Sequence, residues 1–175
     1  MSRARLAYWA LFSITLAVYV AMLFWSLPAI SDAAGGLVPF DLRPGGYDDA
    51  QAQAFLNALS ADGRSFYLTV QHRLDTAFPA LMGATLCFAT LWLYGAARRL
   101  IRICLAVIPI IGGAFDWLEN SYVAAMLSSP VDLISHDLIA AASQATVLKS
   151  AFNTAAMLVV LVGLARLWLT RRDRL

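Results

Sequence analysis

The chain of 175 residues carries too many apolar side chains for a soluble globular domain. Hydrophobic residues make up 61% of it and charged residues 14%, whereas soluble domains average ~45–50% and ~25%. The net charge of +2 is small, and the basic residues stand mostly at the ends of apolar segments, which argues against a nucleic-acid-binding patch. This composition indicates an integral membrane protein, for which the lipid bilayer is the first expected partner.

Four apolar segments are each long enough to cross a bilayer as a helix of ~20 residues. The first has an apolar stretch of ~22 residues, which is longer than the ~7–15 of a signal peptide, so we expect it to be retained. A very short turn separates the second and third segments and predicts an antiparallel helical hairpin. The predicted spans are residues 6–27, 76–97, 101–127 and 146–169, within one transmembrane domain that covers residues 1–175.

The arginines predict the orientation of the spans. Of the eleven acidic residues, only Asp173 lies on the side of the membrane that carries most of the arginines. Cytoplasmic loops are enriched in Lys and Arg, so we expect both termini in the cytoplasm and the protein in a bacterial inner membrane. The eight arginines that define this side are Arg3, Arg5, Arg98, Arg99, Arg102, Arg171, Arg172 and Arg174.

Residues 28–74 form the longest segment between spans and are expected to face the periplasm. Prolines and paired glycines in the first part of this segment predict an irregular loop. A short amphipathic helix follows over residues 50–61, with Asp48 or Asp49 as its N-cap and Gly63 as its stop. We expect this helix to pack on the mouth of the bundle rather than on the membrane surface, because its polar face has no Lys or Arg.

The third span contains two carboxylates and an amide inside an otherwise apolar segment. Asp116, Glu119 and Asn120 are spaced i, i+3, i+4, so they lie on one helix face. A charged side chain at the centre of a bilayer helix costs ~2.5–3.5 kcal/mol on insertion scales, so such residues usually have partners and mark a site. Pro109 should kink this helix shortly before the polar face, and Pro79 should kink the second.

Polar residues of three spans are expected at similar depth, counting ~1.5 Å per residue from the cytoplasmic helix ends. Asp116 lies roughly 24 Å up the third helix and Asp75 about 33 Å up the second. Asn153 and Lys149 lie about 27 and 33 Å up the fourth. Together with two residues at the mouth of the second helix, they form a candidate cluster in the outer third of the membrane. The candidate binding residues are Arg64, Tyr67, Asp75, Asp116, Glu119, Asn120, Lys149 and Asn153.

The sequence alone leaves three interpretations of this cluster open. It is a structural polar network that holds the bundle together, a pocket for a ligand, ion or substrate, or a catalytic site. In the catalytic case Asp116 or Glu119 would be the general acid/base, and Lys149 or Arg64 would stabilise an anionic group. Three carboxylates with one nearby lysine leave the cluster net negative unless some of the acids are protonated or another base enters.

No motif in the chain names a reaction, a metal or a cofactor. His72 and Asp75 are spaced i, i+3, but a zinc or iron site needs a second His or Cys, and His136 lies in a predicted loop. Cys87 and Cys104 fall inside spans and outside any C-x-x-C pair, which predicts small apolar packing residues. There is no phosphate loop and no dinucleotide fingerprint, so we expect neither a metal nor a cofactor.

Five motifs spread over nearly the whole chain carry a family resemblance. They are Phe40-Asp41-Leu42-Arg43-Pro44-x-Gly46-Tyr47, Gly63-Arg64-x-x-Tyr67, Asp75-x-x-Phe78-Pro79, Asp116-x-x-Glu119-Asn120 and Thr146-x-x-Lys149. In these motifs the chain resembles a family of small, uncharacterised bacterial, especially proteobacterial, four-helix integral membrane proteins. The resemblance implies the same topology and brings no activity with it.

The sequence therefore predicts an all-α, polytopic membrane protein with four transmembrane helices in an antiparallel bundle and a short periplasmic amphipathic helix. The leading hypothesis is a non-enzymatic inner-membrane protein whose periplasm-facing polar pocket binds a small ligand, a lipid head group or a partner subunit. The alternative is an intramembrane enzyme that acts on a lipid or amphiphile by carboxylate general acid/base catalysis. A small proton-coupled transporter ranks third, and a homo-oligomer or a complex with another membrane protein is compatible with each hypothesis.

Overall fold

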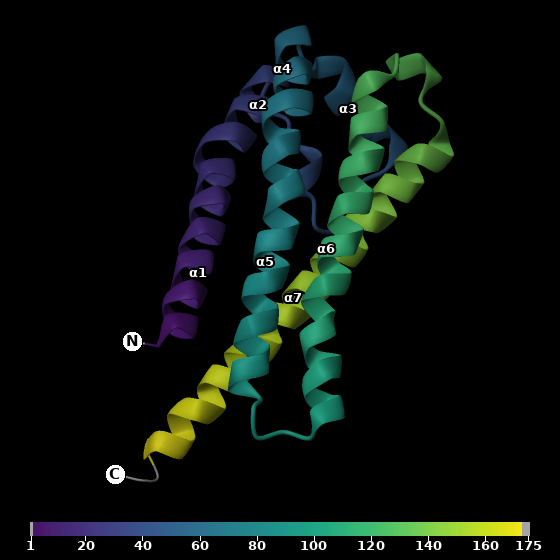
Figure 1. Cartoon of the computed structure of the whole chain (residues 1–175). Helices are drawn as coiled ribbons and strands as arrows, with labels where there is room; N and C mark the ends of the chain where they lie inside the picture. Colours follow the sequence, from purple (N-terminus) through teal and green to yellow (C-terminus); the bar gives the residue numbers. More distant parts are fainter. Residues whose placement is uncertain (1, 173–175) are drawn as a thin grey trace.

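The computed structural model describes residues 2–172, and every regular element in that range is a helix. Four continuous helical stretches are long and apolar enough to cross a membrane (Figure 1). The predicted all-α class and the four candidate spans are thereby confirmed. The stretches cover Arg3–Ala33, Ala61–Leu93, Arg99–Ser128 and His136–Thr170.

Two of the four stretches contain a π-helical turn. The elements in chain order are α1 (Arg3–Ala21), the π turn η1 (Met22–Ser26), α2 (Leu27–Ala33), the 3₁₀ turn η2 (Phe40–Leu42), α3 (Asp49–Ala58), α4 (Ala61–Phe66), the π turn η3 (Tyr67–Gln71), α5 (His72–Leu93), α6 (Arg99–Ser128), the 3₁₀ turn η4 (Val131–Leu133) and α7 (His136–Arg172). The second stretch begins at Ala61 rather than at residue 76, and the fourth at His136 rather than at residue 146. Both helices continue beyond their apolar windows because packing against other elements supports them there.

Residues 34–60, which we call the cap, cover one end of the helices (Figure 1). The predicted capping of α3 by Asp48 is confirmed: its carboxylate accepts a hydrogen bond from Gln51 N at 2.8 Å, and Gln51 Oε1 accepts one from Asp48 N at 3.1 Å. Phe40 and Phe55 are fully buried, with ring centroids 4.9 Å apart. The cap therefore has a hydrophobic core that attaches it to the ends of the membrane helices.

The prediction that Gly63 ends the cap helix is wrong. The helix ends at Ala58, and a new one, α4, begins at Ala61 with Ser60 as its N-cap. Gly63 lies inside α4, where a Cβ atom would come within 2.5 Å of Ala33 Cβ. The glycine is needed because α4 approaches α2 closely, and not because the chain turns at that position.

Helices α5 and α6 cross through a reciprocal pair of prolines and glycines. A Cβ atom on Gly83 of α5 would lie 3.4 Å from the carbonyl oxygen of Pro109 on α6. In the same way, a Cβ atom on Gly113 of α6 would lie 3.3 Å from the carbonyl oxygen of Pro79 on α5. The two backbones therefore approach closely, as small residues allow in membrane helices, and this approach brings the Asp75 face of α5 against the polar face of α6.

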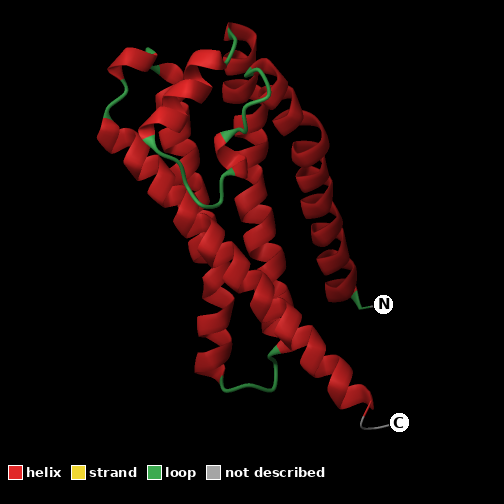
Figure 2. Cartoon of the chain, turned by 180° about the vertical axis from the view of Figure 1, so that it is seen from behind, coloured by secondary structure: helices red, strands yellow, loops and turns green. Residues whose placement is uncertain are grey.

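The arginine-rich segments lie together at the end of the molecule that is farthest from the cap. Figure 1 shows the N-terminus, the C-terminal end of α7 and the turn between α5 and α6 at this end. From behind, the loop of the cap that precedes α3 runs down along the bundle before it returns to the cap end (Figure 2). This descent of the loop brings a cap residue to the level of the polar side chains of the membrane helices.

Replacing Gly112 by alanine should destabilise the packing of α6 on α7. The new Cβ atom would overlap with Asn153 Oδ1 and lie 3.3 Å from Asn153 N. We expect the unfolding free energy in detergent to fall by ~1–3 kcal/mol, as for other overpacked interiors. Gly45→Ala is the control, because a Cβ atom there meets nothing within 4 Å. Thermal unfolding of Gly112→Ala and of Gly112→Ala/Asn153→Ala should show partial recovery in the double variant; equal melting temperatures for Gly112→Ala and wild type would contradict this assignment.

Candidate functional site

Two π-helical turns bring a serine and a glutamine together below the cap. Ser26 is the last residue of η1 and Gln71 is the last residue of η3, and both side chains are fully buried. Ser26 Oγ donates a hydrogen bond to Gln71 Oε1 at 2.5 Å, and Gln71 Nε2 donates one to Asp75 Oδ2 at 2.9 Å. Single π turns inside α-helices occur frequently at functional sites, and here they orient the groups that hold the Asp75 carboxyl.

Side chains of α6 donate hydrogen bonds to backbone carbonyl groups of α5 one turn before Pro79. Pro79 has no N–H, so the carbonyl group of Asp75 one turn earlier has no helical partner. Asn120 Nδ2 donates to this carbonyl oxygen at 2.8 Å, and Trp117 Nε1 donates to the next one, Thr76 O, at 2.9 Å. Asn120 therefore has a structural task that connects α6 to α5 directly beside the Asp75 carboxyl.

Asp41 reaches the same region from the cap. It lies in the 3₁₀ turn η2, and its Oδ2 atom accepts a hydrogen bond from the hydroxyl of Tyr67. Tyr67 is only 3% exposed and is the first residue of the π turn η3. Asp41 is not among the site residues predicted from sequence, because a loop acid between two spans is ordinarily solvated. The available signal was its position between Phe40 and Leu42, two large apolar residues in an otherwise polar, turn-rich segment.

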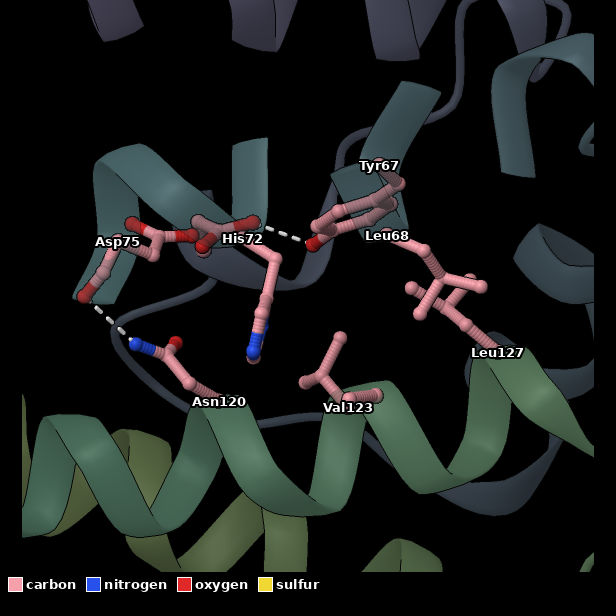
Figure 3. A pocket seen from close by; sticks show the side chains of 9 residues that line it. Tyr67, Leu68, His72, Asp75, Asn120, Val123 and Leu127 are labelled. Atoms are coloured by element: carbon pink, nitrogen blue, oxygen red, sulfur yellow. Dashed lines mark hydrogen bonds between the residues drawn. The ribbon is translucent and has the colours of Figure 1, made fainter. Parts of the chain in front are cut away.

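Asp41 and Asp75 both line a small polar cavity, and Figure 3 shows Tyr67, Asp75 and Asn120 around it. It measures about 10 Å³, which is the space that a single water molecule needs. No lysine or arginine is among the residues that line it. Its polar lining consists of two carboxyl groups, a phenol, an imidazole and an amide. The lining residues are Asp41, Tyr67, Leu68, His72, Asp75, Asn120, Val123, Ala124 and Leu127.

Lys149 of α7 forms ion pairs with the other two carboxylates, those of Asp116 and Glu119. Its Nζ atom lies 3.2 Å from Asp116 Oδ1 and also forms an ion pair with Glu119 Oε2. The second carboxylate oxygen of Glu119 accepts a hydrogen bond from Thr146. The side chains of Lys149, Asp116 and Glu119 are 11%, 7% and 1% exposed, so their charges are largely withdrawn from solvent. Thr146 lies inside α7.

Arg64 and Asn153 lie outside these two groups of contacts. The Arg64 guanidinium donates to Leu127 O at 2.7 Å and to Leu56 O at 3.1 Å, where it satisfies carbonyl groups near the ends of α6 and α3. Asn153 Oδ1 is buried without a hydrogen-bond partner among residues 2–172, beside Gly112. Of the eight binding candidates, six thus share the polar region and Arg64 is committed to backbone carbonyls.

The cap loop is held on α7 by a glycine and a tyrosine. Gly46 has a φ of +82°, and a Cβ atom there would lie 2.6 Å from Ser143 Oγ, so only glycine fits. The next backbone N–H, that of Tyr47, donates to Ser143 Oγ at 2.9 Å. Burial raises the pKa of the Tyr47 phenol above its ordinary value, and the charge of Glu119 acts in the same direction. Tyr47 therefore presents an uncharged phenol from the cap to the Lys149 ion pairs.

Neither cysteine belongs to a polar site. In the described part of the chain both thiols are free, with Cys104 exposed on the outside of α6 and Cys87 partly exposed on α5. Cys104 therefore faces outward, which differs from the packing role expected for it. Among residues 2–172, no three His, Cys, Asp or Glu side chains are placed to hold a metal ion.

Function has to be inferred from this geometry. No protein-family model, curated protein or solved structure matches the chain. The resemblance to small proteobacterial membrane proteins consequently stays a prediction. The residues that the geometry singles out are those that line the small cavity and those that surround Lys149.

Replacing Lys149 by methionine should leave two buried carboxylates without a cation. Breaking a buried ion pair in this way typically costs about 3–5 kcal/mol of unfolding free energy. The matched triple variant Lys149→Met/Asp116→Asn/Glu119→Gln should recover much of the loss, because no unpaired charge is left. Chemical unfolding in detergent measures both effects, with exposed Arg73→Met as the control for loss of a surface cation. A Lys149→Met variant as stable as wild type would overturn the assigned role.

Proposed function

We propose that the chain is a multi-pass protein of a bacterial inner membrane, an antiparallel four-helix bundle with both termini in the cytoplasm and the cap in the periplasm. Large apolar side chains on the outer faces of the spans support the membrane location: Phe24 is 74% exposed, Trp92 65% and Leu161 59%. The orientation is supported by the clustering of arginines at the end that is farthest from the cap. We place the chain with the small proteobacterial membrane proteins that its motifs resemble.

Cysteine labelling tests this orientation. In a chain whose native cysteines are replaced by serine, the Gly45→Cys variant should react with a membrane-impermeant maleimide in intact spheroplasts. Gly45 is exposed and a side chain there meets nothing within 4 Å. An Ala96→Cys variant, in the turn between α5 and α6, should react only after the membrane is permeabilised. The reverse pattern would invert the proposed topology.

We further propose that the periplasm-facing polar pocket binds the cationic group of a small ligand. The observation that carries this proposal is that Asp41 and Asp75 line the same cavity, whose lining has no lysine or arginine. The nearby Lys149 ammonium cannot serve them, because it already contacts Asp116 and Glu119. The buried carboxyl of Asp75 and the half-buried carboxyl of Asp41 line one cavity, and this arrangement favours a positively charged hydrogen-bond donor.

The size of the cavity selects the kind of cation. At about 10 Å³ it has room for a group the size of a water molecule, such as a primary ammonium, and not for a whole sugar or head group. A primary ammonium offers three N–H donors, which match the acceptors of Asp41 and Asp75. The ligand would therefore insert its amine into the pocket and leave its remaining atoms outside.

An intramembrane enzyme receives less support from the contacts. Its candidate acids, Asp116 and Glu119, are both held by Lys149 and lie away from the cavity lining. Arg64, a candidate for stabilising an anion, donates to backbone carbonyls instead. A proton-coupled transporter would use the same Asp41–Asp75 pair with a proton in place of the amine, and the binding measurement below separates the two.

Methylammonium should stabilise the purified protein in mild detergent. Ligand that binds only the folded state adds RT ln(1 + [L]/Kd) to the unfolding free energy, so the melting temperature should rise with methylammonium concentration. Tetramethylammonium, which is too large for the cavity, is the ionic-strength control. Asp41→Asn and Asp75→Asn should each abolish the rise, whereas exposed Asp132→Asn should keep it.

Three results would count against the amine pocket. Equal stabilisation by methylammonium and tetramethylammonium would show a general salt effect. A pocket that is only a structural network predicts that Asp41→Asn and Asp75→Asn unfold readily and that neither cation has any effect. A site that accepts only protons predicts a melting temperature that depends on pH through these two residues and not on methylammonium.

A further inference from the structure

A second concave site lies on the outer side of the cap loop, and it shares no residue with the polar pocket. This groove has a volume of about 470 Å³, within the ~300–1,000 Å³ typical of small-molecule sites. Apolar side chains form most of its surface, and one arginine lies among them. Its walls include Leu37, Val38, Leu42, Arg43, Gly46 and Gln51.

The cap loop has an inner side that packs on the bundle and an outer side that exposes apolar side chains. Phe40 is fully buried and Asp41 bonds to Tyr67, so these two residues face the bundle. Leu37, Val38 and Leu42 are 39%, 47% and 44% exposed, so they face outward. Exposed apolar side chains on the outer side suit a segment that lies between a protein interior and lipid.

Contact with the second candidate span brings the outer side of the loop to the cap end of that span, beside the head-group region of the proposed bilayer. Asp41 is bonded to Tyr67 and shares a cavity with Asp75, and both partners belong to the second candidate span, Ala61–Leu93. Non-helical backbone at this depth needs internal partners for its polar groups. Arg43 supplies one of them, since its Nε and Nη2 atoms donate to Val38 O at 3.0 and 2.7 Å.

Arg43 is held rigidly and keeps an unused donor. Its guanidinium carbon lies 5.9 Å from the ring centroid of Phe40 and 6.0 Å from those of Tyr47 and Phe55. Among residues 2–172 no carboxylate forms an ion pair with Arg43, and its Nη1 atom makes no hydrogen bond. Gln51 uses Oε1 to accept from Asp48 N, so its amide N–H groups remain as further donors in the same groove.

We propose that this groove binds one glycerophospholipid from the surrounding periplasmic leaflet. The phosphate sits at Arg43 Nη1 and the Gln51 amide, and an acyl chain follows Leu37, Val38 and Leu42. A planar guanidinium without a carboxylate partner complements a phosphate, and the apolar wall continues the lipid-facing surface of the spans. The bound lipid covers the loop that carries Asp41, whatever the polar pocket itself binds.

Native mass spectrometry of the full chain, reconstituted with a phosphatidylethanolamine and phosphatidylglycerol mixture and released into mild detergent, tests this site. Wild type should retain one phospholipid, and Arg43→Gln should lower the retained fraction by about tenfold or more, equivalent to ~1.4 kcal/mol. Leu42→Asp should lower it as well, because it places a charge on the acyl wall. Arg73→Gln, an exposed arginine outside the groove, should retain lipid as wild type does.

The outcomes separate the sources of the anion and the two proposed sites. If inorganic phosphate raises the melting temperature of wild type and Leu42→Asp equally, the groove is a free-phosphate site and the lipid assignment is wrong. Equal lipid retention by wild type, Arg43→Gln and Leu42→Asp would also overturn it. Stabilisation by methylammonium should persist in Arg43→Gln, so a failure of either site is recognised independently of the other, and the melting temperature of each variant verifies its folding.

Discussion

A single cation in a low-dielectric region determines which carboxyl groups of this protein are paired and which are left to line the cavity. Lys149 is the only lysine in the sequence, and it is buried between α6 and α7 with two carboxylates. Charges withdrawn from water must be paired, so this ammonium fixes the relative rotation of the two helices. The ammonium group is occupied by Asp116 and Glu119. The other two acids of the polar region, Asp41 and Asp75, therefore share a cavity whose lining has no lysine or arginine. Because Lys149 pairs with Asp116 and Glu119, these two carboxylates are structural, and Asp41 and Asp75 are the pair left to accept a ligand.

The backbone of the spans imposes a second requirement that the side chains meet. Two prolines and two π turns each disturb the regular series of helical hydrogen bonds, and in lipid the freed groups have no water to bind. Asn120 and Trp117 supply donors for the carbonyl groups that Pro79 leaves free, and Arg64 does so near two helix ends. Polar residues in the membrane helices therefore serve the backbone first, and only a subset of them is left to face the cavity.

The sequence sufficed to predict the class, the four spans and most of the polar region. The hydrophobic windows and the i, i+3, i+4 spacing of Asp116, Glu119 and Asn120 carry that information, because helical geometry converts spacing directly into faces. Asp41 and Gln71 could not be found in this way. Asp41 arrives through an irregular loop whose path has no period, and the inward direction of Gln71 depends on a π turn that shifts the helical register.

The anchoring of the cap to α7 has a consequence for the order of assembly. Tyr47 N–H bonds to Ser143, which follows it by 96 residues, and Gly46 packs against the same serine. During synthesis the cap loop leaves the ribosome long before its docking surface exists, and such non-local contacts form late. The three earlier spans can insert and pair while the loop is still undocked. Insertion of α7 then supplies Ser143, so the cap loop is fully docked only once this last helix has been made, whereas the residues that line the polar cavity all precede it.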